Sequence, residues 1–527
     1  MIIFAVGMQH ASVMTKYPIG LQDFKGLIED GYVYVDKTAL IHNLAASGKY
    51  YFLSRPRRFG KSLLVSTLKA YFLGQKELFK GLAIEKLEQD WKTYPVFHLD
   101  LNAAKYTEPE ALVANIDGHF RLFEKEYAVD SSGMTLPERF KSIILKAYEK
   151  TGQKVVILVD EYDKPLIEAI GNEALQNDYR KTLKSVYGVA KSMDACIQFA
   201  FFTGVTKFSK VSVFSDLNNL KDITMDARYA TVCGITEEEL HGMFDAEVGQ
   251  MAQNLGISKE ACYEQLKQEY DGYHFRHNSV GVYNPFSLLN AIDNKEFDDY
   301  WFETGTPAFL VETLKRNDYE LENLTREEVS SDLLGSLDSI DTNPLPLLYQ
   351  SGYLTIKGYK PRFGTYILGF PNGEVERGFT RFLFRYYAPI RIDQTDSFVS
   401  NFTVEVESGQ PEKFMPRLEA MFAGQDYQVV GHTEIYFHNV TSLVFKLLGF
   451  YTDVERHTTD GRMDMLVQTK DFVYIFEFKI DKSADEALAQ IEEKQYAKPF
   501  EQDPRKLYKI GVNFSSETKR IESWKVI

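Results

Sequence analysis

Four short apolar runs in the first half of the chain place the strongest limit on its fold. They are Tyr50–Leu53, Val96–Leu101, Val155–Val159 and Phe199–Phe202, and helical patterns separate them. Each run is β-branched or aromatic and apolar on both faces, which is typical of strands in a parallel sheet covered by helices. Buried helix segments are the alternative, but each run is too short for one. The sequence therefore predicts an α/β domain over residues 17–235.

The expected secondary structure changes along the rest of the chain. Thr236 and Glu239 form a capping box at a helix start, and helical patterns then dominate to about residue 340. A helix end, Leu345–Ser351, precedes two strands, Tyr353–Ile356 and Thr365–Phe370. This order indicates a winged helix, although a module that only packs between domains explains it equally well. The predicted organisation is an N-terminal extension (1–16), the α/β domain (17–235), a helical lid and winged-helix-like region (236–390), a connector (391–425) and a second α/β domain (426–527).

Composition and charge exclude several classes of protein. The chain is 44% hydrophobic and 26% charged, which is ordinary for a folded protein and excludes a largely disordered one. No stretch approaches the roughly 18 apolar residues that cross a bilayer, so we expect no membrane partner. Three cysteines without metal-ligand spacing favour a reducing, cytoplasmic location. Because the net charge is -15, binding of nucleic acid would need a local basic surface.

A phosphate-binding loop is predicted directly after the first apolar run. Residues 54–62 are Ser-Arg-Pro-Arg-Arg-Phe-Gly-Lys-Ser, and a helix follows from Leu63. Backbone N–H groups at a helix start point at anions, and the helix dipole favours negative charge there. Gly60 lets the backbone come close, Lys61 would reach the β- and γ-phosphates, and Ser62 would hold Mg²⁺.

Acidic residues at the end of another buried run strengthen this prediction. Arg55 stands where the general phosphate-loop pattern has its first glycine, so the loop alone is a weak signal. Asp160 and Glu161 follow the run Val155–Val159, and two acids at the tip of an apolar strand are costly without a cation or proton to serve. Asp160 would fix the Mg²⁺ shell and Glu161 would polarise the attacking water; a helix-capping pair is the alternative. Thr203, after the fourth run, would either sense the γ-phosphate or be a satisfied strand-end hydroxyl.

This part of the chain contains the motifs Tyr34–Thr38, Phe52–Leu63, Asp160–Asp163, Thr203–Thr206, Leu217–Leu220, Tyr270–Tyr273 and Tyr283–Phe286. Together they resemble the AAA-ATPase-like family of bacterial proteins. The resemblance covers most of residues 17–290, and arginine at position 55 is usual in that family. It implies ATP binding and hydrolysis without indicating a pathway. Arg57 and Arg58 would either touch phosphate or brace a neighbouring element. The expected nucleotide-binding residues are Arg57, Arg58, Phe59, Gly60, Lys61, Ser62, Leu63, Asp160 and Thr203.

A β-hairpin near the C-terminus carries a second candidate site. Residues 461–468 and 472–479 each have the pattern of a strand, and a short turn joins them. Asp464 lies on the first arm, while Glu477 and Lys479 lie two apart on the second and therefore point to one face. The flanking residues are apolar on both faces, so a surface Glu-x-Lys pair is a poor explanation, and a buried Glu and Lys must pair or serve chemistry. Two carboxylates chelate Mg²⁺, and a lysine steadies a phosphoryl transition state.

The order of acid, hairpin, Glu-x-Lys and helix resembles the PD-(D/E)XK nuclease superfamily over about residues 430–515. In that pattern an upstream helix supplies a glutamate, for which Glu434 fits; Glu455 is a further acidic candidate. In the subfamily usually fused to this ATPase, the downstream helix carries a glutamine, here Gln490, with Tyr496 six residues later. The catalytic residues that the resemblance implies are Glu434, Asp464, Glu477, Lys479 and Gln490, with Asp464 and Glu477 as Mg²⁺ ligands.

Together the two regions predict an ATPase joined through a helical region to a Mg²⁺-dependent nuclease that acts on DNA or RNA. ATP and Mg²⁺ are the expected cofactors, nucleic acid is the expected partner, and a homo-oligomer is compatible with the sequence. One alternative is a nucleotide-driven switch whose C-terminal domain binds nucleic acid or protein without cleaving. Another is a structural regulator with neither activity. The residues that argue against these alternatives are Lys61, Asp160, Glu161, Asp464 and Lys479.

Overall fold

The structure is a computed structural model that forms two compact units, built mainly of residues 1–300 and of residues 301–527. Within its described part, no helix is both long and apolar enough to cross a bilayer. The described residues are 15–208, 213–214, 217, 219–302, 308–325, 328–335, 343–387, 395–423, 433–447, 449, 451–454, 457–458, 461–462 and 464–527.

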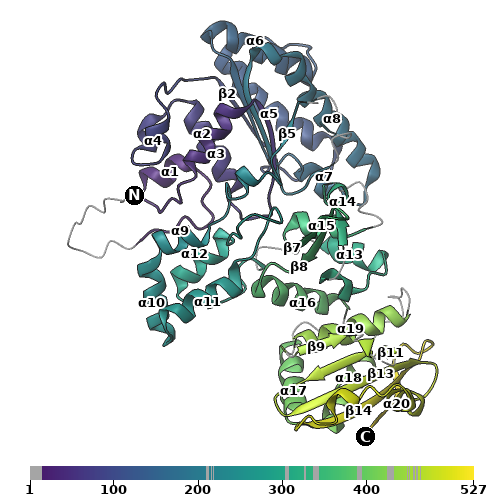
Figure 1. Cartoon of the computed structure of the whole chain (residues 1–527). Helices are drawn as coiled ribbons and strands as arrows, with labels where there is room; N and C mark the ends of the chain where they lie inside the picture. Colours follow the sequence, from purple (N-terminus) through teal and green to yellow (C-terminus); the bar gives the residue numbers. More distant parts are fainter. Residues whose placement is uncertain are drawn as a thin grey trace. The chain divides into compact units, whose positions relative to one another are not determined.

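A five-stranded parallel sheet forms the centre of the first unit and confirms the predicted α/β fold (Figure 1). The strand order is β2-β3-β4-β1-β5. All residues of β1, and all of β3, are buried, because helices cover both faces of the sheet. The fifth strand was not predicted, since it is only two residues long and polar. The strands are β1 (Tyr50–Ser54), β2 (Val96–Asp100), β3 (Val155–Asp160), β4 (Ile197–Gly204) and β5 (Lys221–Asp222).

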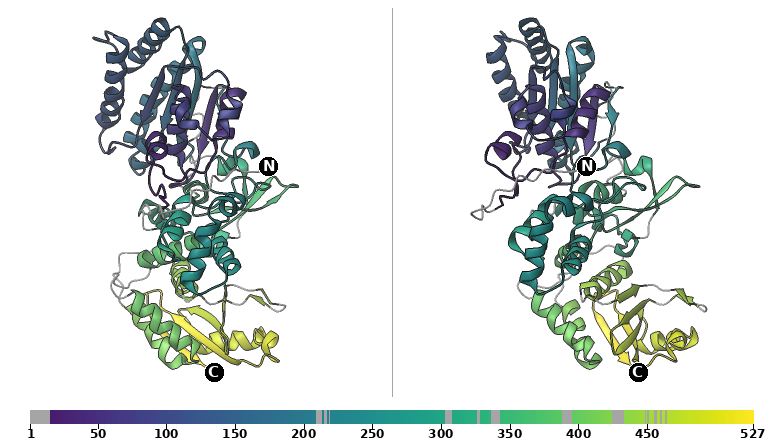
Figure 2. Two further views of the ribbon diagram at one scale, coloured as in Figure 1. Left: turned by 90° about the vertical axis from the view of Figure 1, so that its left-hand side faces the viewer. Right: turned by 60° about the vertical axis from the view of Figure 1, so that its left-hand side comes forward.

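Helices lie on either side of this sheet (Figures 1 and 2). Helix α3 packs against β2, β3 and β4, while α5, α6 and α8 pack against one another. Each long helix is amphipathic; α8, for example, buries Tyr179, Leu183 and Val186 at helical spacing. The helices are α1 (Phe24–Glu29), α2 (Thr38–Ser47), α3 (Lys61–Phe72), α4 (Ile84–Leu87), α5 (Pro109–Tyr127), α6 (Leu136–Thr151), α7 (Lys164–Glu168) and α8 (Glu173–Ser192).

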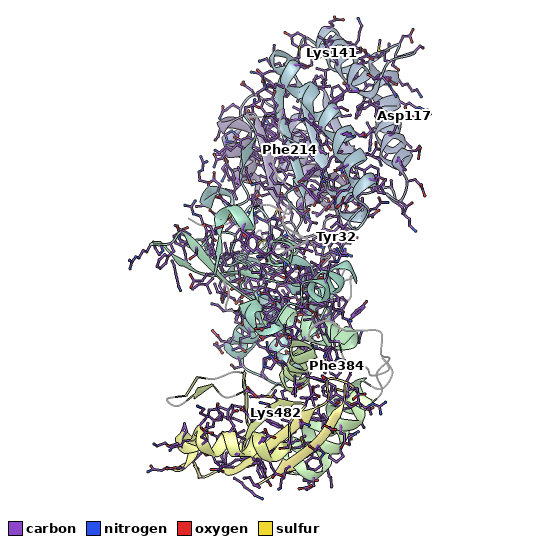
Figure 3. All side chains as sticks on the ribbon, turned by 90° about the vertical axis from the view of Figure 1, so that its right-hand side faces the viewer. Tyr32, Asp117, Lys141, Phe214, Phe384 and Lys482 are labelled. Atoms are coloured by element: carbon purple, nitrogen blue, oxygen red, sulfur yellow. The ribbon has the colours of Figure 1, made fainter. Side chains whose placement is uncertain are left out.

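An aromatic cluster joins the sheet to helix α8. Phe214, labelled in Figure 3, lies with its ring centroid 5.0 Å from Tyr162 and 5.2 Å from Phe202. It also stacks on Tyr187 of α8 at 5.9 Å. These rings are buried, so the segment after β4 is anchored beside the ends of β3 and β4.

A group of helices completes the first unit. The capping box predicted at Thr236 is present: its hydroxyl accepts from Glu239 N, and the Glu239 carboxylate accepts from Thr236 N. Buried residues that include Leu240, Leu266 and Leu288 form a separate core here. The helices are α9 (Glu237–Met243), α10 (Asp245–Leu255), α11 (Lys259–Tyr270) and α12 (Pro285–Asn294).

The second unit begins with helices and a small antiparallel sheet of order β6-β8-β7. The predicted hairpin is β7 and β8, and the predicted helix before it is α15. The short strand β6 adds a third strand that the sequence did not predict. The winged-helix assignment stays a prediction. The elements are α13 (Ala308–Arg316), β6 (Glu328–Ser330), α14 (Ser331–Leu334), α15 (Leu345–Ser351), β7 (Thr355–Lys360), β8 (Thr365–Gly369) and α16 (Gly373–Tyr387).

A mixed five-stranded sheet forms the C-terminal domain, in the order β15-β14-β13-β12-β9 (Figure 2). Strands β13 and β14 are parallel and α20 connects them, whereas the other pairs are antiparallel. Helix α20 lies so close to β14 that a Cβ at Gly511 would collide with the backbone oxygen of Ala484. The elements are α19 (Thr433–Leu447), β9 (Tyr451–Val454), β10 (His457–Thr458), β11 (Gly461–Arg462), β12 (Met465–Gln468), β13 (Phe472–Ile480), α20 (Ala484–Glu493), β14 (Lys506–Phe514) and β15 (Ile521–Val526).

The segment expected to be a connector, residues 391–425, differs from that expectation. It contains two helices, α17 (Thr395–Glu407) and α18 (Pro411–Ala423). Both contact the C-terminal sheet: Tyr474 OH donates to Val406 O at 2.6 Å, and Phe414 packs edge-on against Tyr474. The helices are amphipathic but rich in polar residues, which made them resemble a linker. The expected extension, residues 1–16, lies outside the described residues except for its last two.

Candidate functional site

The predicted phosphate loop has the backbone geometry of an anion site. Strand β1 ends at Ser54, and helix α3 begins at Lys61 directly after the loop. Gly60 has a φ of 85°, in the left-handed region that side chains rarely adopt, so glycine is needed at this position. The first N–H groups of α3 therefore face the end of the loop, where the helix dipole favours a phosphate.

Arg55, which replaces the first glycine of the general pattern, is a structural residue in this loop. Its side chain is 1% exposed, and the guanidinium donates to the backbone oxygens of Ser54, Thr224 and Tyr229 at 2.8, 2.9 and 3.1 Å. The guanidinium carbon lies 3.8 Å from the centre of the Phe275 ring. Arg55 thus fixes the base of the loop to later parts of the first unit.

The remaining loop side chains also contact the helical group. Phe59 is buried, and its ring packs edge-on against Tyr273 at 4.7 Å, which gives the Tyr270–Tyr273 motif a structural role. The Arg58 guanidinium lies 4.6 Å from the ring of Phe286, as expected for a bracing residue. Arg57 is exposed, and its contact with phosphate stays a prediction.

Lys61, Asp160 and Glu161 meet at the carboxyl end of β3. Glu161 has a φ of 53°, and this strained backbone turns its carboxylate to within 3.3 Å of the Lys61 ammonium. Lys61 also donates to Pro56 O at 3.2 Å. Asp160 is 4% exposed and accepts a hydrogen bond from Ser62. Burial, and then the charge of Glu161, raises the pKa of Asp160 to about 7.

Thr203 lies beside these acids at the end of β4. Strands β3 and β4 are neighbours, with Val159 opposite Phe202. The Thr203 side chain is fully buried, and its hydroxyl has no hydrogen-bond partner among the described residues. The contact of this hydroxyl with the γ-phosphate stays a prediction. Leu63 lies in the first turn of α3 and is half-buried.

The C-terminal hairpin brings its three predicted charged residues together. The Lys479 ammonium lies 2.9 Å from Glu477 Oε1, so the two side chains share one face of β13 as their spacing predicts. Asp464, directly before β12, accepts a hydrogen bond from Phe478 N at 2.8 Å. Glu477 is 1% exposed. Burial, and then the charge of Asp464, raises the pKa of Glu477 to about 7.

Helix α20 supplies the predicted glutamine. Lys479 Nζ donates to Gln490 Oε1 at 2.6 Å, and the buried Tyr496 hydrogen-bonds with Gln490. The lysine is thus held between a carboxylate and an amide. Glu434 lies in the first turn of α19, but its side chain is outside the described residues, as is the whole of Glu455.

The C-terminal site fits a divalent cation. Glu477 Oε2 is buried and has no hydrogen-bond partner among the described residues, so it is available as a ligand. A magnesium ion bound through two carboxylates would take its other ligands from water or a substrate phosphate. Among the described residues there is no cluster of three or more His, Cys, Asp or Glu side chains that could hold a metal ion.

Two features of the first site were missed by the sequence analysis. The Lys61–Glu161 contact joins residues 100 positions apart and depends on the order of the strands. Asp163 was quoted only as part of a motif, yet its carboxylate is fully buried and hydrogen-bonded to Thr206. A third acid so soon after a buried strand was the signal that could have identified it.

Two family models match separate parts of this chain. A family model described as "Predicted AAA-ATPase" matches residues 18–214, and a model of the PD-(D/E)XK nuclease superfamily matches residues 432–524. An uncharacterized protein in the vnfD 5′ region of Azotobacter chroococcum mcd 1 is 34% identical over 522 residues. That alignment covers 96% of this chain and 98% of the relative, so the whole domain order is shared.

Proposed function

This chain belongs to the predicted AAA-ATPase family with a C-terminal PD-(D/E)XK nuclease-superfamily domain, and we propose that it hydrolyses ATP to control cleavage of DNA or RNA. The proposal has three parts: an ATPase in the first unit, a Mg²⁺-dependent phosphodiesterase at the C-terminal hairpin, and coupling between them. Each part rests on different residues and can fail alone.

In the first part, residues of the phosphate loop and of the β3 tip divide the work. The N–H groups at the start of α3 bind phosphate oxygens, and Lys61 leaves Glu161 to contact the β- and γ-phosphates. Glu161 then orients and accepts a proton from the attacking water, while Ser62 and Asp160 are the residues that would hold Mg²⁺. Arg57 and Thr203 would contact the terminal phosphate. This assignment is supported by the 3.3 Å contact between Lys61 and Glu161.

In the second part, the hairpin holds a scissile phosphate. Asp464 and Glu477 would bind Mg²⁺, and Lys479, positioned by Gln490, would orient water and stabilise charge on the phosphate oxygens. Glu434 would contribute from α19. At either site, bound Mg²⁺ would neutralise negative charge that develops on the transferring phosphoryl group.

One observation carries the nuclease proposal: the buried, unpartnered Glu477 Oε2 beside a lysine. A buried carboxylate oxygen without a donor is destabilising unless a cation or proton completes it. Such an oxygen is expected in a metal site, whereas in a domain that only binds nucleic acid or protein it would lower stability without serving a function.

The proposal that the two activities are coupled rests on the length and the secondary structure of the region between the sites. More than 200 residues separate Thr203 from Asp464. Those that the structure describes are mostly in helices and a small sheet, whereas a flexible linker would be polar and rich in Gly and Ser. Such folded segments can transmit nucleotide state, so we expect cleavage to depend on ATP.

All three parts of the proposal are tested by a nuclease assay, with and without ATP, on the wild-type chain and on the variants Lys61→Ala and Asp464→Ala. We expect cleavage to require ATP, to be lost in Lys61→Ala together with ATP binding, and to be lost in Asp464→Ala while ATP turnover continues. Cleavage that is abolished by Asp464→Ala but indifferent to ATP and to Lys61→Ala would refute the coupling. Cleavage that survives Asp464→Ala would refute the nuclease assignment, and ATP turnover that survives Lys61→Ala would refute the phosphate site. If ATP is hydrolysed and nucleic acid is bound without cleavage, the chain is a nucleotide-driven switch.

A further inference from the structure

A buried carboxylate connects the ends of strands β3 and β4. Asp163, the residue before helix α7, is fully buried. Its carboxylate accepts hydrogen bonds from Val205 N at 3.3 Å, from Thr206 N at 2.5 Å and from Thr206 Oγ1 at 2.6 Å. Three donors converge on this one group, and all three come from the turn that follows β4. Asp163 therefore holds that turn against the segment after β3.

The neighbouring residues reinforce the same junction. A Cβ at position 204 would collide with Asp163 Oδ1, so Gly204 is what allows the carboxylate to lie against the backbone of the turn. Tyr162 N donates to Thr203 O at 3.0 Å, and Tyr162 OH donates to Thr206 O at 3.1 Å. The two segments are thus joined at both ends of the turn by buried hydrogen bonds.

This junction lies directly behind two groups proposed to act on ATP. Glu161, which contacts Lys61, lies two residues before Asp163 on the segment after β3. On the other segment, Thr203 is followed by Gly204 and then by the turn residues Val205 and Thr206, and its buried hydroxyl has no hydrogen-bond partner among the described residues. Burying a carboxylate, and leaving a hydroxyl unpaired, both cost stability. A turn built only for packing would need neither, and this pairing favours a functional reason for the arrangement.

We propose that Asp163 is a positioning residue that fixes the distance between the Thr203 hydroxyl and the Glu161 carboxylate. Both groups can then reach the γ-phosphate of the same ATP molecule. In this proposal the fully buried Asp163 does not contact the nucleotide itself, and acts through the turn residues Val205 and Thr206. The inference rests on the proposed ATPase function and adds to it the means by which ATP is distinguished from ADP. ADP lacks the γ-phosphate, so its binding should not depend on this turn.

The test compares the binding of ATP and ADP, and the hydrolysis of ATP, in the wild-type chain and in Asp163→Asn, which keeps the size of the side chain. The amide nitrogen of the new residue would face an N–H or O–H donor and loosen the turn. We expect kcat to fall by about 10–100-fold, as for loss of an outer-shell partner. We also expect the preference for ATP over ADP to shrink, while the Kd for ADP stays within about twofold, because only the γ-phosphate contact is affected.

A double-mutant cycle with Thr203→Val separates positioning from simple loss of structure. If Asp163 acts through Thr203, the double variant Asp163→Asn/Thr203→Val should keep no less ATP preference than Thr203→Val alone. If the two losses of ATP preference simply add, Asp163 does not act through Thr203 and the proposal is overturned. An equal loss of affinity for both nucleotides with kcat unchanged would overturn it as well.

Thr206 provides a second route if Asp163→Asn does not fold. Thr206→Val removes one of the three donors at nearly constant volume, whereas Thr206→Ser retains the hydroxyl. We expect Thr206→Val to lower kcat and the ATP preference in the same direction as Asp163→Asn, and Thr206→Ser to rescue both. Equal behaviour of the Val and Ser variants would overturn the proposal. If the wild type binds no ATP, the proposed function itself is refuted. If the wild type hydrolyses ATP and both Asp163→Asn and Thr206→Val do so at the same rate, only this inference is refuted.

Discussion

The two candidate sites use the same pair of side chains in different ways. In each, a lysine ammonium contacts a glutamate carboxylate beside a second acid: Lys61 with Glu161 at 3.3 Å, and Lys479 with Glu477 at 2.9 Å. In the first site the lysine comes from helix α3, and the glutamate is the residue directly after β3. In the second, both residues belong to β13.

The exposure of the two glutamates also differs. The Glu161 side chain is 19% exposed, whereas that of Glu477 is 1% exposed. A glutamate that reaches solvent can meet a water molecule and act as a base, while a buried one is better suited to hold a cation. The lysines differ in their second partner: Lys61 is held by a backbone oxygen, and Lys479 by the side chain of Gln490. The comparison predicts that equivalent substitutions will have unequal effects.

The largest effect is expected from Glu161→Gln. Removing the proposed base should slow ATP hydrolysis by about 10²–10⁴-fold. ATP should still bind in the presence of Mg²⁺, because Asp160 and Ser62 serve the metal. Measurements of ATP affinity and of single-turnover hydrolysis on the same preparation check both statements. Failure of the variant to bind Mg·ATP would mean that Asp160 and Glu161 have the opposite roles, and the two sites would then be more alike than proposed.

Lys479→Met should have the next largest effect, and on the other site alone. Loss of a cation that stabilises the transition state lowers a rate by about 10²–10³-fold, so nuclease activity should fall by that amount. Methionine keeps much of the side-chain volume, and ATP turnover provides the internal control. Affinity for Mg²⁺ should not decrease, since the lysine competes with a cation for Glu477. Weaker Mg²⁺ binding in this variant would indicate that Lys479 organises the metal ligands and has no direct role in catalysis.

The same comparison explains how much of each site could be predicted from sequence. The Glu477–Lys479 pair follows from strand geometry, because residues two apart on a strand point to one face. The acids after β3 were predictable as well, since helix-covered parallel strands appear as apolar runs that end abruptly. The Lys61–Glu161 contact was not, because it requires the order β2-β3-β4-β1, which no local pattern contains. Helices α17 and α18 were missed for another reason: half-exposed helices carry many polar residues, and Val404 is 59% exposed.

Acidity should weaken Mg²⁺ binding at both sites. Burial raises the pKa of Asp160 and that of Glu477 to about 7, so each carboxyl is increasingly protonated below pH 7 and must lose that proton to bind a cation. Affinity should therefore fall as the pH is lowered from 8 to 6, approaching about tenfold per unit below the pKa for one proton released. Calorimetry on Lys61→Ala would measure Mg²⁺ binding at the C-terminal site. Calorimetry on Asp464→Ala in the presence of ATP would measure Mg²⁺ binding at the first site. A flat profile at either site would show that its carboxylate is ionised despite its burial.

The smallest effect, from Gln490→Ala, addresses the difference in how the two lysines are held. Lys61 is held by the backbone oxygen of Pro56, which no substitution removes, whereas the tether of Lys479 is a side chain. Loss of an outer-shell partner typically lowers activity by about 10–100-fold, and the effect here should lie at the lower end because Lys479 keeps its contact with Glu477 after the change. We therefore expect nuclease activity to fall by about tenfold or less, clearly less than in Lys479→Met, with ATP turnover unchanged. Gln490→Glu is the matched control, because it keeps an oxygen at the tether while adding a negative charge beside Glu477. An effect of Gln490→Ala as large as that of Lys479→Met would place Gln490 among the groups that contact the substrate, and the lysine would then be held by Glu477 alone.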